Sequence, residues 1–180
     1  MDAGGRATHG AVAENAYLAG DAVDDDPMNQ LRGHSITYRI AKMRTDIIAT
    51  RSQVKAALHN NKIQLLDLRP SDFYLGITRS SKNKTAGTIP GAKNLPVPWL
   101  TENNGGKMRP VAELKKLYDV ANISMDGEQI TFCVTGQWAS LGWFVAYELL
   151  GNKNARLYDG SMADWTHDPA LPVERKVVLN

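Results

Sequence analysis

One stretch of the chain constrains its fold more than any other: a strand-like run, a short loop and a helix-like run over residues 129–151. Residues 130–133 are apolar and rich in β-branched and aromatic side chains, which predicts a buried strand. The following run ends at Gly151, a residue typical of a helix C-cap. Its apolar side chains at helical spacing are Leu141, Phe144, Val145 and Leu149. Cys133, the only cysteine in the sequence, therefore lies where a strand ends and a tight loop leads into a helix.

This position of Cys133 has a chemical consequence. The first N–H groups of a helix have no partner within the helix, and the helix dipole places positive partial charge there. A concave loop of N–H groups adds to this field and favours an anion at its centre. A thiol in such a place forms its nucleophilic thiolate more readily. The alternative is that Cys133 is a small buried apolar residue without a reaction to perform, as most lone cysteines are.

The residues around Cys133 resemble the active loop of rhodanese domains, which has the form Cys-x-x-Gly-x-x-Ala. In this chain the loop reads Cys133-Val134-Thr135-Gly136-Gln137-Trp138-Ala139-Ser140. Three further blocks resemble the family's motifs, in the family's order: the Asp-x-Arg strand end at 65–69, the Gly-His-Ile-Pro-Gly-Ala segment at 86–96, and the last strand and turn at 158–161 with Trp165. The closest resemblance is to the C-terminal halves of tandem sulfurtransferases that use thiosulfate or 3-mercaptopyruvate.

Alternating strand and helix patterns predict an α/β fold with a mainly parallel sheet covered by helices on both faces. The resemblance implies the five-stranded rhodanese sheet. The expected strands are residues 46–50, 63–68, 93–95, 130–133 and 155–158. The expected helices are one capped by Ser52, then 111–120, 139–150 and 161–166, and residues 71–92 are expected to be a long loop.

Composition suggests three parts in the chain. Residues 1–45 are rich in glycine and acidic residues and predict an irregular N-terminal arm or linker, or the end of a preceding domain. The resemblance implies that residues 46–175 form the rhodanese-like domain, and residues 176–180 are expected to be a tail. The polar first residues have no apolar signal region, which favours the cytoplasm. The periplasm stays open if the chain is a fragment of a longer precursor.

Several kinds of function are disfavoured by the sequence. The net charge is only +2 with the basic residues scattered, which argues against a nucleic-acid surface. No apolar run approaches 18 residues, so no membrane-spanning helix is expected. A single cysteine excludes an internal disulfide, and no metal is expected because the histidines are isolated. They are His9, His34, His59 and His167.

The resemblance implies sulfur transfer through a persulfide on Cys133, from a donor of the thiosulfate or 3-mercaptopyruvate class to a thiol or cyanide. No cofactor is needed, because backbone amides of the loop can stabilise the anionic sulfur. The residues expected to supply these amides are Val134, Thr135, Gly136, Gln137, Trp138 and Ala139. Trp138 either forms a wall of the pocket or packs on the domain.

Asp67 and Arg69 are expected to form an ion pair that braces the active loop, with direct substrate contact as the alternative. Basic residues that some thiosulfate-using rhodaneses carry within the loop are replaced here by Val134 and Thr135, so the loop lacks charges for a dianionic donor. Arg79 or Lys82, in the long loop, could supply the missing charge.

Two other functions are alternatives to an enzyme that transfers sulfur between small molecules. A cysteine phosphatase needs an arginine after five intervening residues, and that position is Ala139, which disfavours it. A rhodanese-like module that carries sulfur between proteins, or binds a partner, stays open. A second rhodanese domain upstream also stays open, because tandem sulfurtransferases have one.

Overall fold

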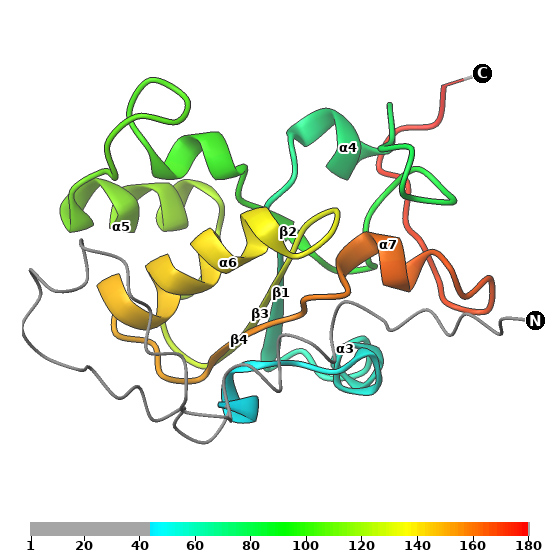
Figure 1. Cartoon of the computed structure of the whole chain (residues 1–180), viewed down its shortest axis with the longest axis horizontal. Coiled ribbons are helices and arrows are strands. Elements are labelled where there is room, and N and C mark those ends of the chain that lie inside the picture. The colour runs from blue at the N-terminus through cyan, green and yellow to red at the C-terminus, as the bar shows by residue number, and fades with distance from the viewer. Residues whose placement is uncertain (1–43, 180) are drawn as a thin grey trace, which may run out of the picture. The chain divides into compact units, whose positions relative to one another are not determined.

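The computed structural model describes residues 44–179, whose centre is a sheet of four parallel strands (Figure 1). The strands are β1 (Ile63–Asp67), β2 (Lys93–Asn94), β3 (Glu128–Phe132) and β4 (Ala155–Leu157). Their order is β2-β1-β3-β4, and β1 pairs with β3 along its whole length. The carboxyl ends of all four strands therefore lie at one edge of the sheet, where ligands of such sheets bind.

The prediction of a fifth strand over residues 46–50 is wrong. Thr45–Ile47 is a turn of 3-10 helix, η1, closed by the Ile48 amide, which donates to Thr45 O. Only Ile48 makes a parallel bridge, to Leu157 of β4, because Thr50 already caps the next helix. The fifth strand of the expected sheet is thus reduced to a single bridge beside β4.

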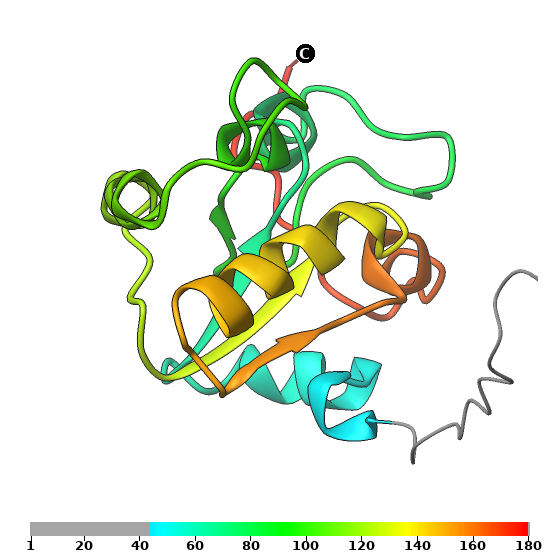
Figure 2. The same cartoon turned by 60° about the vertical axis from the view of Figure 1, so that its left-hand side comes forward.

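Helices cover both faces of the sheet (Figure 2). The helical segments are α3 (Arg51–Ala57), α4 (Ser71–Leu75), η2 (Val97–Leu100), α5 (Val111–Val120), α6 (Gln137–Phe144), η3 (Val145–Leu149) and α7 (Ser161–Trp165). Side chains of α3 and α7 belong to one core, and those of α5, α6 and η2 to the other. Within residues 44–179, no helix has the length and apolar character needed to cross a bilayer.

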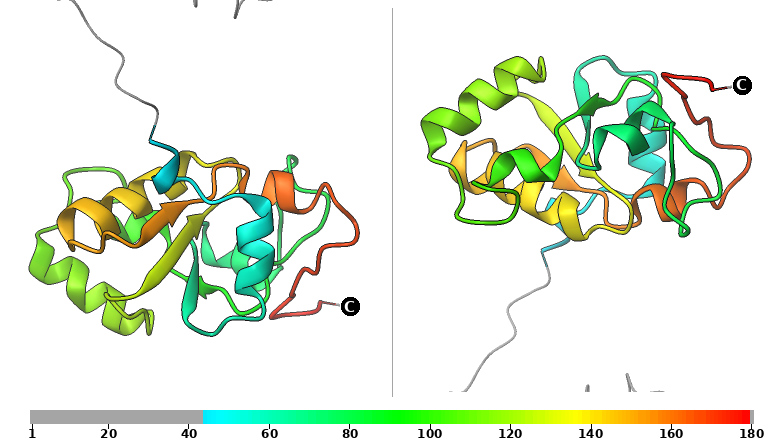
Figure 3. Two further views of the ribbon diagram at one scale, coloured as in Figure 1. Left: turned by 90° about the horizontal axis from the view of Figure 1, so that it is seen from below. Right: turned by 90° about the horizontal axis from the view of Figure 1, so that it is seen from above.

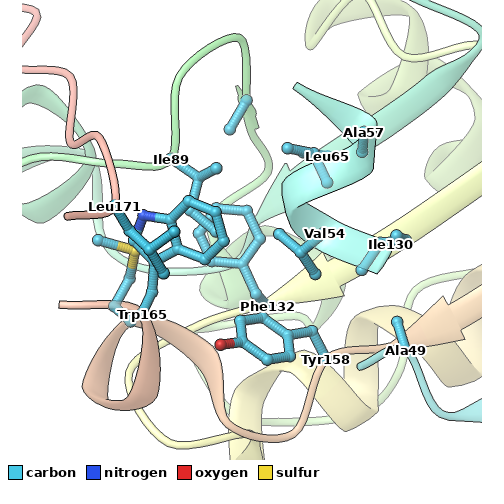
Figure 4. Packing of buried hydrophobic residues seen from close by; sticks show 12 residues of the cluster. Ala49, Val54, Ala57, Leu65, Ile89, Ile130, Phe132, Tyr158, Trp165 and Leu171 are labelled. Carbon is cyan, nitrogen blue, oxygen red and sulfur yellow. The ribbon is translucent and has the colours of Figure 1, made fainter. Parts of the chain in front are cut away.

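Side chains along each strand alternate between the two faces of the sheet, and this alternation creates the two cores. Leu65 of β1 points into the core beneath α3, and its neighbour Leu66 into the core beneath α6. Phe132 of β3 packs in the first core with Trp165, and both are fully buried (Figure 4). Cys133, the next residue, belongs to the second core. The strand therefore delivers Cys133 to the face on which α6 lies.

Two local expectations are corrected by the structure, and a third is confirmed. The cap of α3 is Thr50 rather than Ser52: Thr50 accepts from the Gln53 amide and donates its own amide to the Gln53 side chain, so both end groups are satisfied. The expected loop at 71–92 begins with α4, which ends at Gly76 in a left-handed conformation. The helix predicted over 111–120 is confirmed as α5.

The packing face of α6 also differs from the apolar pattern. Phe144 is 41% exposed, whereas Gly142 is buried against β1. A Cβ at Gly142 would lie 2.8 Å from the side chain of Leu68, so glycine lets the helix approach the sheet closely. Glycine has no side chain and is not counted in an apolar pattern. The pattern therefore includes Phe144 and leaves out Gly142, although Gly142 is the residue that packs inward.

The segment after α7 returns across the domain beside residues 86–92 (Figure 3). Thr88 and Glu174 exchange backbone hydrogen bonds of 2.8 Å, and the Val177 amide donates to Leu75 O. Residues before and after the expected domain end at 175 thus both make backbone hydrogen bonds to the rest of the domain. Of the expected N-terminal arm, residues 1–43 lie outside the described part of the chain.

Acid stability should depend on Asp164, which accepts hydrogen bonds from Arg51 and Tyr158 and so connects α3, β4 and α7. The Arg51 guanidinium lowers the pKa of Asp164 in the folded protein. Stability from this group is therefore present above the carboxyl's ordinary pKa and is lost as the pH falls through the lowered one. We expect Asp164→Asn to reduce the free energy of unfolding by less than about 1 kcal/mol at neutral pH, and the difference to disappear as the pH falls through the lowered pKa of Asp164.

Urea unfolding of both proteins across this pH range measures the difference. Asp126→Asn is the control, because it removes an exposed carboxylate that has no ion pair within residues 44–179. A wild-type advantage that grows on acidification would contradict the prediction.

Candidate functional site

Cys133 lies directly after β3 and lines a cavity of about 340 Å³, which we call the cysteine cavity. The residue itself is only 1% exposed, so the thiol lies below the surface, next to this cavity. The lining residues are Phe73, Ser80, Lys82, Cys133, Val134, Thr135, Gln137 and Trp138. They come from three places: the segment after β1, the loop after β3, and the first turn of α6.

The loop Val134–Ala139, which we call the cysteine loop, is oriented by the amides of α7. Met162 N donates to Cys133 O at 3.1 Å, and Ala163 N donates to Val134 O at 2.9 Å. In a trans peptide the N–H points opposite to the C=O. Fixing these two carbonyls toward α7 therefore directs the Val134 and Thr135 amides away from it.

The amides of the cysteine loop are free. Within residues 44–179, none of the six backbone N–H groups from Val134 to Ala139 donates a hydrogen bond to the protein. A run of N–H groups without partners at a helix start beside a cavity is suited to bind an anion. Gly136 and Ala139 are buried, while Trp138 is 40% exposed.

Ser161, the first residue of α7, also contacts the start of the cysteine loop. Its buried hydroxyl accepts from Cys133 N at 3.0 Å and donates to Tyr158 O at 3.0 Å. The same oxygen lies 4.0 Å from Cys133 Sγ. The sequence placed residues 158–161 in the family's last strand and turn; the contact of Ser161 with the thiol is added by the structure.

Substitution of Gly136 should distort the cysteine loop. Gly136 has φ +89°, and a Cβ there would lie 2.3 Å from Asp159 Oδ1 and 2.8 Å from Asp159 O. We expect Gly136→Ala to cost about 2–3 kcal/mol of folding stability, because the left-handed strain adds to this overlap. Urea denaturation measures the loss. Gly151→Ala is the control: it has φ +81° but no atom within 4 Å of the new Cβ, so it reports strain alone and should cost less. Equal costs would contradict the overlap argument.

Asp67 and Arg69 form a fully buried ion pair. Arg69 Nε and Nη2 donate to the two carboxylate oxygens of Asp67, at 2.9 and 2.5 Å. The remaining contacts reach Thr88, whose hydroxyl donates to Asp67 at 2.7 Å, and Gly87 O, which accepts from Arg69 at 2.8 Å. The pair thus holds the segment around residues 87–88, and neither residue lines the cysteine cavity.

The two candidate cations of the long loop are placed differently. Arg79 is turned into its own loop, where Nη1 donates to Asn83 O at 2.7 Å. It does not line the cysteine cavity, whereas Lys82 does. Nothing in the sequence indicated that Phe73 and Ser80 line the cavity; both lie within residues 71–92, which were expected to be one long loop.

Comparison with known proteins gives a consistent family. Residues 50–168 match the model of the rhodanese-like domain. Over 136 residues the chain is 35% identical to a Haloferax volcanii protein named "Putative thiosulfate sulfurtransferase", covering 72% of this chain and 46% of the relative. It is 29% identical over 175 residues to Thiosulfate/3-mercaptopyruvate sulfurtransferase 2 of Arabidopsis thaliana, covering 95% and 50%. It is 30% identical over 152 residues to Sulfur carrier protein TtuD of Thermus thermophilus, covering 79% and 51%. The chain thus spans about half the length of the curated relatives it matches.

Solved structures agree on the fold. The anaerobic ergothioneine biosynthesis enzyme from Chlorobium limicola superposes with a TM-score of 0.68 at 23% identity, over 75% of this chain and 33% of that one. Tum1 from Saccharomyces cerevisiae gives 0.63 at 24% identity, over 74% and 48%. Together with the family match, the shared architecture leads to one conclusion: the chain belongs to the rhodanese-like domain family.

Proposed function

We propose that this protein is a sulfurtransferase that moves a sulfane sulfur from a small donor, of the thiosulfate or 3-mercaptopyruvate class, to a thiol or cyanide. Cys133 is the residue that carries the sulfur. The observation that supports this most is the combination of a lone thiol next to a cavity with six free amides in the loop that follows it. The names of the relatives point to the same reaction type.

In the first half-reaction with thiosulfate, the Cys133 thiolate attacks the outer sulfur of the donor. A new S–S bond forms to Cys133, the donor's S–S bond breaks, and sulfite leaves with the bonding electron pair. In the second half-reaction, the acceptor attacks the outer sulfur of the persulfide and the Cys133 thiolate is restored. Charge stays on sulfur throughout, and free amides fixed around it stabilise that charge without reorganising.

The remaining candidate residues receive supporting roles. Asp67 and Arg69 position the backbone at 87–88, which lies on the same edge of the sheet as Cys133. Arg79 stabilises its own loop, and Lys82 supplies positive charge at the cysteine cavity. Gln137 and Trp138 contribute backbone amides to the cysteine loop and side chains to the wall of the cysteine cavity. We further propose that a second rhodanese-like domain accompanies this one, since the matched relatives are about twice as long as the matched region.

A sulfur carrier is the second candidate. Its support is the relative named a sulfur carrier protein, and the exposed Trp138 beside the cavity, which offers an apolar contact to a partner. A carrier exchanges sulfur faster with a partner protein than with small molecules. The rate of transfer from a cysteine desulfurase, compared with the rate from thiosulfate to cyanide, distinguishes the two.

Intact-mass measurement tests the proposed function. The protein is incubated with thiosulfate or 3-mercaptopyruvate, desalted and weighed, and we expect one added sulfur atom, which peptide mapping places on Cys133. Addition of cyanide should remove the sulfur and yield thiocyanate. Failure of both donors to add sulfur, with a cysteine desulfurase also failing, would reject sulfur transfer.

A further inference from the structure

The walls of the cysteine cavity are mainly apolar. Phe73 of α4, Val134 of the cysteine loop and Trp138 of α6 form them. The polar side chains among the lining residues are neutral, apart from one lysine. The volume of about 340 Å³ corresponds to roughly eleven water molecules. A small inorganic ion would leave much of this space to water and most of the apolar surface without a partner.

Lys82 is the one charged residue in that lining. Its ammonium forms no ion pair within residues 44–179, so it is free to pair with a ligand. Arg79, the other cation of this loop that the sequence suggested, is engaged with Asn83 O. A dianion such as thiosulfate would thus meet one side-chain cation and the loop amides beside apolar walls, so that burying it costs more than burying a monoanion.

Resting on the proposed sulfur transfer, we propose that the preferred donor is an organic monoanion that carries its sulfane sulfur next to an apolar group. Thiosulfonates (R–SO₂–S⁻) and organic persulfides (R–S–S⁻) both have this chemistry. The apolar group R packs against Phe73 and Trp138, and Lys82 pairs with the negative charge. The outer sulfur then reaches Cys133 and the free amides of the cysteine loop.

The transfer step balances for this class. The Cys133 thiolate forms a bond to the outer sulfur of R–SO₂–S⁻ while the S–S bond of the donor breaks. The sulfinate R–SO₂⁻ leaves with the electron pair of that bond, and Cys133 retains the sulfur as its persulfide anion. No oxidant, reductant or proton is consumed. A persulfide donor reacts in the same way and releases R–S⁻.

A homologous series tests the proposal. Single-turnover loading rates are measured with methane-, propane- and pentanethiosulfonate and with thiosulfate, each divided by its rate with a free thiol to correct for intrinsic reactivity. Each buried methylene should raise the second-order rate constant about fourfold. We expect pentanethiosulfonate to exceed thiosulfate by at least about tenfold.

Matched variants separate the contribution of the apolar wall from that of the Lys82 charge. Trp138→Ala should flatten the chain-length dependence, whereas Phe144→Ala should not, because Phe144 is equally exposed on the same helix but does not line the cavity. Lys82→Gln should slow every thiosulfonate by a similar factor and keep the chain-length dependence. Lys84→Gln is its control, since Lys84 lies on the same loop but lines a different cavity.

Rapid loading by thiosulfate with no chain-length dependence would overturn this donor assignment while leaving the proposed sulfur transfer in place. A chain-length dependence that survives Trp138→Ala unchanged would also overturn it. Absence of sulfur on Cys133 with every donor would overturn both.

Discussion

Cys133→Ser is expected to abolish sulfur loading, with a fall in the rate of transfer on the order of 10⁴-fold or more. A serine hydroxyl is not ionised at neutral pH, and it cannot form the S–S bond that holds the transferred sulfur. The free amides of the cysteine loop then surround a neutral group and have no anion to stabilise. Intact mass after incubation with donor, together with thiocyanate formation from cyanide, measures the loss.

Folding must be measured on the same variant, because Cys133 belongs to the core beneath α6. Serine is close to cysteine in size, and Ser161 already places a hydroxyl 4.0 Å from the sulfur. We therefore expect an unchanged circular dichroism spectrum and a stability loss of no more than about 2 kcal/mol. Retained sulfur transfer in a folded Cys133→Ser protein would refute the role given to this residue.

Asp67→Ala is expected to give the largest loss of stability, about 3–5 kcal/mol. Asp67 and Arg69 are both 0% exposed, and removal of the carboxylate leaves the buried guanidinium without its counter-charge. The Thr88 hydroxyl loses its acceptor in the same substitution. A loss of this size is a large part of the total free energy of unfolding of an ordinary domain. Urea denaturation, analysed for both midpoint and slope, measures it.

Two comparisons make the Asp67 result specific. Glu113→Ala breaks the exposed Arg109–Glu113 pair on α5 and should cost at most about 1 kcal/mol. The double variant Asp67→Leu/Arg69→Met removes both charges and should recover part of the loss, because an apolar pair needs no counter-charge. A cost for Asp67→Ala no larger than that for Glu113→Ala would show that the buried pair adds nothing.

The sequence predicted the central unit of the fold well because its signals are local. β3, the cysteine loop and α6 follow each other without interruption. A short run of apolar, β-branched and aromatic residues, a glycine in the loop and apolar residues at helical spacing each carry their own pattern. Cys133 could therefore be placed at a strand end from the sequence alone. The helix α5 was predicted with its observed ends because Pro110 precedes it and its apolar spacing is regular.

Features that depend on distant contacts could not be predicted in this way. The apolar run at 46–50 resembles a strand, but whether it pairs depends on where β4 ends and where α3 begins. The choice between Arg79 and Lys82 depends on how the long loop folds, since Asn83 O draws the arginine away. The bonds from α7 to the carbonyls of Cys133 and Val134 likewise join segments far apart in sequence.

Those bonds from α7 set the order in which the molecule can be completed. Met162 and Ala163 are synthesised well after Cys133, and until they dock, nothing holds the two carbonyls that orient the loop. A chain that ends at β4 contains Cys133 and all four strands of the sheet, but not the two amides that orient the cysteine loop. These bonds can therefore form only once the chain has been synthesised through Ala163.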